Sequence, residues 1–268
     1  MRANTMTMRP LTGSIGAEIL DLDLRGLDDT RFADIRQAFL DNCMLVFRDQ
    51  HLNAADLTEF GHRWGETFHT PHATPLDGFP DTIAIRNRGK AGTTTEYWHT
   101  DSVFSPRPPA LSILAAQTVP PAGGDTMFAN QYLAYETLSP GLRALAETLR
   151  AGYYRTASMG RVMGDASSAV KTADHPVVRT HPETGRKALY LSYDPTVRLE
   201  GFSESESRAI VALFAAHATQ PAFCYRHRWQ PGDVVMWDNR SAVHFAVHDY
   251  GEQERLHFRM TIAGDVPR

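Results

Sequence analysis

The feature that most constrains the fold is a recurrence of short apolar runs, most of them set between turns rich in proline and glycine. Runs of this length that end at such turns are typical of β-strands. No internal repeat or linker separates them, and helical periodicity is concentrated near the N-terminus and in insertions. We therefore predict a mostly β domain with flanking helices, a barrel or sandwich rather than a βαβ sheet. The main runs cover residues 43–48, 82–85, 110–118, 125–128, 234–238 and 256–262.

Helices are expected between these strands. The first follows residues 28–30, with Thr30 or Asp29 as its N-cap, and the last begins at a capping box at Ser203. Residues 155–174 have little periodicity and many Gly, Ser, Met and Ala, which favours a lid or insertion within a single domain that spans residues 1–268. The other predicted helices cover residues 53–64 and 133–150, the latter interrupted at 139–141, and a hairpin is predicted over 175–192.

Charge and composition exclude several classes of partner. The net charge is −4 and no long basic run is present, so nothing favours binding to nucleic acid. No stretch approaches the roughly 18 apolar residues of a membrane span, and residues 1–10 lack the apolar core of a secretory signal. The only cysteines, Cys43 and Cys224, are expected to be free thiols in a reducing cytoplasm.

The chemistry-bearing stretch is residues 96–104, which contains His99-x-Asp101. If this stretch is a strand, both side chains project from one face and form two corners of a metal site. A second histidine would complete the 2-His-1-carboxylate triad that binds Fe(II) with three open positions, and His244 is the candidate. An H-x-D pair alone is weak, and no GxGxxG, P-loop or HExxH motif accompanies it.

Two arginines lie further along the chain, on the strand predicted at its end. Arg255 and Arg259 are four residues apart and share a face of an extended strand. Inside a barrel they would suit carboxylates or other anions, because a guanidinium can bind such a group with two hydrogen bonds. The alternative is a solvated edge, or a pairing of Arg259 with Asp238 or Asp249.

Taken together, these residues resemble the TauD/TfdA family, the taurine-dioxygenase-like Fe(II)- and 2-oxoglutarate-dependent oxygenases. The resemblance runs from about residue 13 to residue 262. It implies a double-stranded β-helix, the jelly-roll or cupin-like fold. It is carried by His99-x-Asp101, Gly123-Gly124-Asp125-Thr126, Trp237-Asp238-Asn239-Arg240, His244, Arg255 and Arg259.

The resemblance also implies roles for individual residues. His99, Asp101 and His244 match the family's iron ligands, and Thr126 and Arg255 match the pair that binds the distal carboxylate of 2-oxoglutarate. Arg259 matches the arginine that binds the anionic end of the prime substrate. The expected reaction consumes O2 and 2-oxoglutarate, hydroxylates a small organic anion and gives succinate and CO2. We further expect a homo-oligomer, a dimer or a tetramer.

The chain departs from the taurine enzymes at two places. Thr95 stands where they carry an asparagine, and the sulfonate-binding histidine has His69, or His72 further on, as its nearest candidate. The substrate therefore stays open between a sulfonate, an alkyl sulfate and an aryloxyalkanoate or other carboxylate. Desaturation or ether cleavage at the same iron centre is an alternative, and so is a non-catalytic jelly-roll binding protein.

Overall fold

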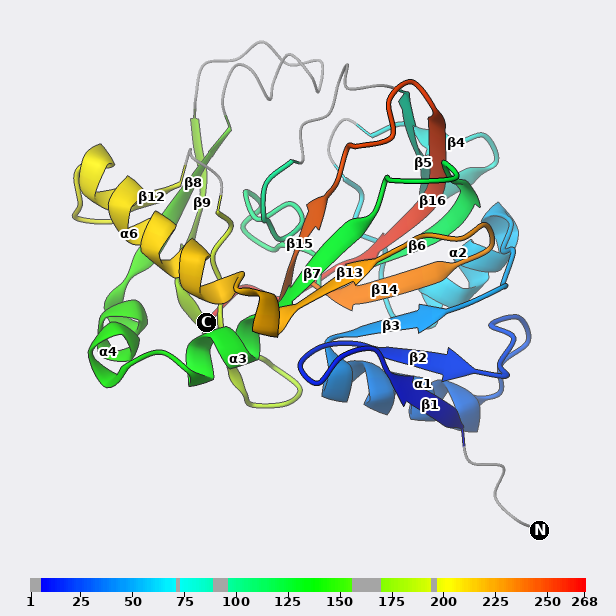
Figure 1. Cartoon of the computed structure of the whole chain (residues 1–268), viewed down its shortest axis with the longest axis horizontal. Coiled ribbons are helices and arrows are strands. Elements are labelled where there is room, and N and C mark those ends of the chain that lie inside the picture. Colours follow the sequence, from blue (N-terminus) through cyan, green and yellow to red (C-terminus); the bar gives the residue numbers. More distant parts are fainter. Residues whose placement is uncertain (1–5, 71–72, 89–95, 156–169, 194–196) are drawn as a thin grey trace.

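The architecture described here is that of a computed structural model, which describes residues 6–70, 73–88, 96–155, 170–193 and 197–268. Its centre is an eight-stranded sheet of order β1-β2-β3-β14-β6-β16-β5-β4, accompanied by a three-stranded sheet of order β13-β7-β15 (Figure 1). The strands of the large sheet are β1 (Thr7–Pro10), β2 (Ala17–Leu20), β3 (Met44–Phe47), β4 (Pro75–Leu76), β5 (Phe79–Arg88), β6 (Leu111–Thr118), β14 (Val234–Asp238) and β16 (Glu254–Ile262). Those of the small sheet are β7 (Thr126–Asn130), β13 (Cys224–His227) and β15 (Ala242–Ala246).

The large sheet is covered on its outer face by α1 (Asp29–Asn42) and α2 (Ala54–His62). Phe39 of α1 and Phe60 of α2 pack with Leu45, Ile113 and other apolar residues of the central strands in one buried cluster. Both helices have side-chain caps, which satisfy backbone N–H groups that a helix leaves without a partner at its start. The cap of α1 is Asp28, so the prediction of Thr30 or Asp29 was wrong by one residue or two.

A second apolar cluster lies between the two sheets. Val235 and Trp237 of β14 and Leu114 of β6 meet Phe128 of β7 and Ala242 of β15 there. This sheet-on-sheet packing is the layer arrangement expected of a jelly roll, and the predicted mostly β fold is confirmed.

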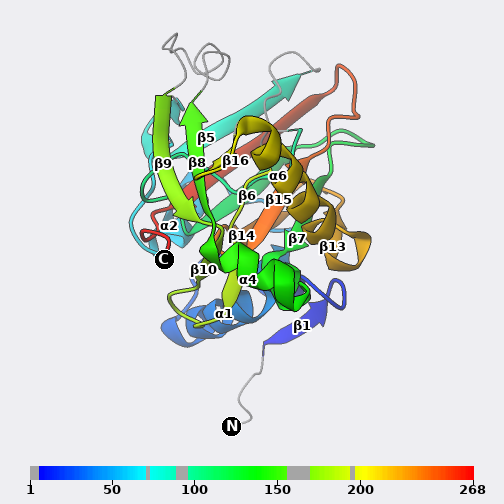
Figure 2. The same cartoon turned by 90° about the vertical axis from the view of Figure 1, so that its left-hand side faces the viewer.

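The insertion between β7 and β13 forms a separate apolar cluster at one side of the molecule, on the left in Figure 1. Figure 2 shows β8 and β9 side by side on this flank. The predicted helix over residues 133–150 is two helices, which meet where Ser139 caps the second one. The described elements of the whole insertion are α3 (Gln131–Glu136), α4 (Pro140–Thr148), β8 (Arg150–Arg155), β9 (Val170–Pro176), β10 (Val178–Thr180), β11 (Lys187–Leu189), β12 (Arg198–Leu199), α6 (Glu204–Ala218) and the 3₁₀ turn Pro221–Phe223.

Several further predictions can be compared with these elements. The capping box at Ser203 starts α6, and the hairpin over residues 175–192 is present as β10 and β11. The strand predicted over residues 82–85 is longer, since β5 runs for ten residues. Residues 156–169 of the predicted lid lie outside the described residues, and the extent of the domain stays a prediction. Cys43 and Cys224 are both free. Among the described residues, no helix is long and apolar enough to span a membrane.

Candidate metal centre

Two strand-like segments bring the predicted triad together. His99 and His244 of β15 exchange both backbone hydrogen bonds, at 2.9 and 2.8 Å, in an isolated antiparallel bridge. Their rings lie 4.1 Å apart between centroids. One potential ligand atom from each of His99, Asp101 and His244 lies within 4.8 Å of the other two, and all three residues are buried. The predicted cluster is therefore present in the fold.

The route by which Asp101 reaches the cluster differs from the prediction. Asp101 begins a turn, and the next residue, Ser102, has a left-handed backbone with φ of 43°. The same-face argument for a continuous strand was therefore wrong, although the fold does bring the two side chains into one cluster. The turn places Oδ1 of Asp101 3.6 Å from Nε2 of His244.

The protonation states of the three side chains suit a divalent cation. Burial and the neighbouring His99 hold the pKa of His244 well below its ordinary value, so its imidazole is neutral. Burial alone would raise the pKa of Asp101, but the charge of Arg259 and the hydrogen bond from Ser112 oppose that effect, and the pKa of Asp101 lies well below its usual range. Nδ1 of His99 lies 2.8 Å from the carbonyl oxygen of Tyr97, which leaves Nε2 as the nitrogen with a lone pair. Metal ligands must be deprotonated in this way.

Arg255 of β16 is a buried cation that forms no ion pair with any described residue. It is only 6% exposed, and none of the ion pairs between described residues includes it. Its Nε donates to the carbonyl oxygen of Gly124 at 3.1 Å and its Nη2 to Oγ1 of Thr126 at 3.5 Å, both neutral acceptors. Burial lowers the pKa of Arg255 to about 10, which marks the cost of an unpaired buried charge. A carboxylate would remove that cost.

The hydroxyl oxygen of Thr126 in β7 accepts hydrogen bonds from two neighbouring side chains. Nε1 of Trp229 donates to Oγ1 of Thr126 at 3.0 Å, and the guanidinium of Arg255 lies over the Trp229 ring, 5.6 Å from its centroid. Because the oxygen of Thr126 accepts from both neighbours, its own hydroxyl proton can point toward a third group. Thr126 and Arg255, predicted as a pair, are in contact.

Arg259 connects the cluster to a pocket. Its Nη2 lies 2.6 Å from Oδ2 of Asp101, and its Nε donates to Oγ1 of Thr261 at 3.1 Å. The alternative pairing with Asp238 or Asp249 was wrong: Asp238 pairs with Arg240, and Asp249 pairs with Arg226.

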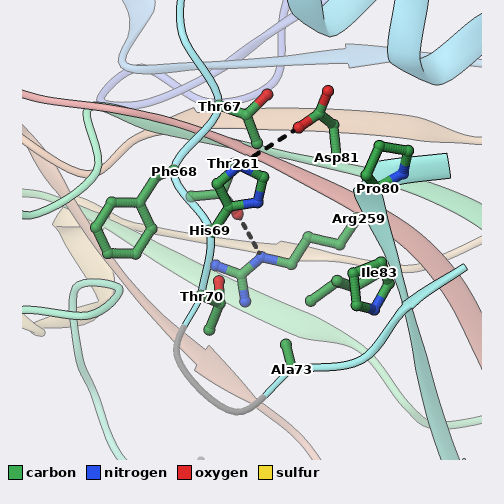
Figure 3. Close-up of a pocket in the computed structure, with 11 residues that line it drawn as sticks. Thr67, Phe68, His69, Thr70, Ala73, Pro80, Asp81, Ile83, Arg259 and Thr261 are labelled. Atoms are coloured by element: carbon green, nitrogen blue, oxygen red, sulfur yellow. Dashed lines mark hydrogen bonds and ion pairs between the residues drawn. The ribbon is translucent and has the colours of Figure 1, made fainter.

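The pocket itself contains His69 beside Arg259, as Figure 3 shows. Nε2 of His69 lies 3.6 Å from Oδ1 of Asp81, whose other oxygen is 2.8 Å from Nε2 of His62. Thr95 and His72, the other residues considered for substrate binding, lie outside the described residues. The pocket is lined by Thr67, Phe68, His69, Thr70, Ala73, Pro75, Pro80, Asp81, Ile83, Arg259 and Thr261.

The sequence did not reveal three polar residues at the centre. Ser112, Asn239 and Trp229 each contact a predicted site residue. Asn239 lies within the Trp237-Asp238-Asn239-Arg240 motif, which was a usable signal. Ser112 is one serine in an apolar run and offered no signal.

Comparison with known proteins gives a consistent result. The model of the family described as taurine catabolism dioxygenase TauD, TfdA family matches residues 7–261. An alkylsulfatase of Acinetobacter baylyi is 37% identical over 97% of this chain and 86% of the relative. An alpha-ketoglutarate-dependent sulfate ester dioxygenase of Pseudomonas putida is 36% identical over 98% of this chain and 91% of the relative. The crystal structure of a taurine dioxygenase from Burkholderia xenovorans aligns with a TM-score of 0.84 and 36% identity, covering 98% and 92% of the two chains.

Proposed function

Since the chain belongs to the TauD/TfdA family and is a 2-oxoglutarate-dependent non-haem iron dioxygenase, we propose that His99, Asp101 and His244 hold its Fe(II) and that Thr126 and Arg255 hold the distal carboxylate of 2-oxoglutarate. The donor set supports the metal assignment, because two imidazoles and one carboxylate form the facial triad of Fe(II) oxygenases. The counter-ion that Arg255 lacks supports the co-substrate assignment.

When bound, iron and 2-oxoglutarate supply the oxidation: O2 is consumed, 2-oxoglutarate becomes succinate and CO2, and one oxygen atom goes to the substrate. The residues of the chain position these groups. Arg255 neutralises a carboxylate in a buried site, where a charge-assisted hydrogen bond is stronger than in water. Thr126 adds a neutral donor to the same group. The aromatic rings of Phe128 and Trp237 contact His244 and keep its side of the centre apolar.

The proposed prime substrate is a small organic anion, with an alkyl sulfate ester as the first candidate. The observation that carries this proposal is Arg259, whose guanidinium lies between Asp101 and the pocket that contains His69. Thr261, Ser112 and Asp101 accept from its Nε and Nη2, and no hydrogen bond among the described residues uses its Nη1. Apolar residues such as Phe68 and Ile83 line the same pocket and suit an alkyl chain. The sulfate ester activities named for two relatives favour this class.

Hydroxylation of the carbon that bears the sulfate oxygen would give an unstable product. The new hydroxyl and the sulfate would share one carbon, so loss of the proton and of the C–O bond to sulfate leaves an aldehyde and inorganic sulfate. Sulfate release coupled to succinate formation is therefore the expected signature of an alkyl sulfate substrate. A sulfonate hydroxylated beside its sulfur would lose sulfite instead.

The test compares an alkyl sulfate, an alkanesulfonate, a carboxylate and a neutral ether of matched carbon skeleton for succinate release. We expect the wild type to prefer the sulfate ester and Arg259→Ala to lose most of the difference between the anions and a neutral ether. Arg86→Ala, which removes an exposed arginine from the neighbouring strand, is the matched control. Equal turnover of the neutral ether by the wild type would contradict the assignment of Arg259.

The proposal includes a homo-oligomer, a dimer or a tetramer, in the cytoplasm. The free thiols of Cys43 and Cys224 support a reducing compartment. Light scattering on the purified protein tests the oligomeric state.

A further inference from the structure

Ser112 is a fully buried serine of β6 with three polar neighbours. Its Oγ lies 3.2 Å from Nδ2 of Asn239, 3.1 Å from Nη2 of Arg259 and 2.7 Å from Oδ2 of Asp101. A hydroxyl has one proton to donate and two lone pairs that accept. Three neighbours therefore use the hydroxyl completely, and its proton can have only one destination.

The side-chain amide of Asn239 determines which way the hydrogen bonds around Ser112 run. Its Oδ1 lies 3.0 Å from Nε1 of Trp237 and 3.3 Å from the backbone nitrogen of Asp101. An indole N–H and a backbone N–H can only donate, so the atom between them must be the amide oxygen. The amide nitrogen of Asn239 then faces Ser112 and donates to it.

Ser112 consequently receives two donors, the amide of Asn239 and the guanidinium of Arg259. Both of its lone pairs are occupied, and its proton is directed to Oδ2 of Asp101, which as a carboxylate oxygen accepts. Arg259 donates to the same oxygen at 2.6 Å. Oδ2 is thus held by two donors, while Oδ1 faces Nε2 of His244 at 3.6 Å.

We propose that Ser112, oriented by Asn239, is the positioning residue that makes Asp101 a ligand through one oxygen only. The inference rests on the proposed metal site. A carboxylate that bound through both oxygens would occupy one more coordination position, whereas a facial triad must leave three. The hydrogen bonds that fix Oδ2 therefore keep a position open for the reactants.

The test uses Co(II) as a spectroscopic probe, without 2-oxoglutarate, so that it does not depend on turnover. Ser112→Thr and Ser112→Val form a matched pair, because they differ only in a hydroxyl against a methyl group. Outer hydrogen-bond partners of metal ligands are worth about 10–100-fold in metal affinity. We expect Ser112→Val and Ser112→Ala to weaken Co(II) binding by about that factor and to alter its visible absorption, and Ser112→Thr to restore both.

Ser207→Ala controls for the loss of a buried serine hydroxyl elsewhere. Ser207 lies in α6, and its Oγ accepts a hydrogen bond from the backbone nitrogen of Leu199 in β12. The variant should lower the melting temperature without changing Co(II) affinity. Identical Co(II) affinity and spectra in Ser112→Val and Ser112→Thr would overturn the role of Ser112. His244→Ala separates this from the parent proposal: if that variant binds Co(II) as tightly as the wild type does, the metal site itself is wrong, and the inference with it.

Discussion

At the scale of single residues, the interior face of β16 carries two side chains that lack an ordinary partner. Arg255 is a buried cation with only neutral acceptors, and His257 is fully buried with neither ring nitrogen hydrogen-bonded to a described residue. Native structures satisfy most buried polar groups, so each exception needs a reason. For Arg255 the reason that we propose is the distal carboxylate of 2-oxoglutarate. His257 packs edge-on against Trp229, 4.4 Å away between centroids, and no ligand is needed to explain its place.

Replacing Arg255 with Gln is expected to weaken 2-oxoglutarate binding by roughly 30-fold or more, since losing one partner of a buried charge pair costs about 2–5 kcal/mol. Anaerobic titration of the Fe(II) enzyme measures this effect. Affinity for the prime substrate should change far less, and Arg86→Gln should change neither. Equal losses for both ligands would identify Arg255 as a structural residue.

Replacing His257 with Met is expected to stabilise the protein, by about 1 kcal/mol in the free energy of unfolding, because it removes a buried polar group whose unmade hydrogen bonds cost about 1–3 kcal/mol. Denaturant titration provides the measurement. His227→Met is the contrasting variant, since Nε2 of His227 lies 3.2 Å from Oδ2 of Asp233 and that contact would be lost. If both variants destabilise equally, His257 contributes to stability as much as the hydrogen-bonded His227 does, and the argument from its unmade hydrogen bonds fails.

At the scale of elements, the turn between β6 and β7 determines how Thr126 and Arg255, the proposed 2-oxoglutarate residues, lie. Gly123 and Gly124 both have left-handed backbones, with φ of 78° and 73°. A Cβ on Gly124 would lie 3.1 Å from Pro120 and 3.3 Å from Cδ of Arg255, tighter than ordinary contact. The Gly-Gly pair thus lets the turn approach Arg255 closely. The carbonyl oxygen of Gly124 accepts a hydrogen bond from the Arg255 guanidinium.

Gly124→Ala should therefore lower both stability and 2-oxoglutarate affinity. A left-handed non-glycine residue costs about 1–2 kcal/mol, and the added methyl pushes on Arg255. Gly141→Ala, in helix α4 with nothing within 4 Å of the added Cβ, should instead be neutral or stabilising. Thermal unfolding and co-substrate titration of the two variants decide the matter, and an unchanged affinity in Gly124→Ala would contradict the argument.

The sequence predicts an element well where its hydrophobic pattern reflects burial, and poorly where the element is partly exposed. Strands β3 and β14 were predicted because every residue in them is buried. β5 was underestimated, because its polar end around Arg86 lies at the surface. His99 and Asp101 were singled out by their spacing, and His244 joined them as the candidate second histidine, which the family resemblance supported. Ser112 could not be predicted, because its role depends on neighbours that only tertiary structure brings together.

At the scale of the whole molecule, several histidines are buried where they do not easily accept a proton. Burial lowers the pKa of His175 and His227, and it holds the pKa of His257 well below its ordinary value. In the unfolded chain each would titrate near 6.5. Below that pH the unfolded state binds more protons than the folded state, so acid favours unfolding.

We accordingly expect the free energy of unfolding to fall as the pH drops from about 6.5 to about 4.5, before most carboxylates titrate. Each such histidine contributes at most about 1.4 kcal/mol per pH unit. Denaturant titrations across this window measure the slope, and His257→Met should make it shallower by up to that amount. A stability that is constant over the window would refute the prediction.

The bridge between His99 and His244 has a consequence for the chain as a polymer. The two residues are separated by 145 positions in sequence (244 − 99), yet they exchange both backbone hydrogen bonds. If the proposed ion binds both side chains, it forms a reversible crosslink that closes a ring containing the whole insertion. Because such an ion would bind the folded chain and not the unfolded one, it would stabilise the fold by mass action, by about 2.7 kcal/mol at a free-ion concentration 100 times the Kd. A chain in which β15 has not yet docked offers the ion only His99 and Asp101, so tight metal capture also reports that both ends of this long interval have completed folding.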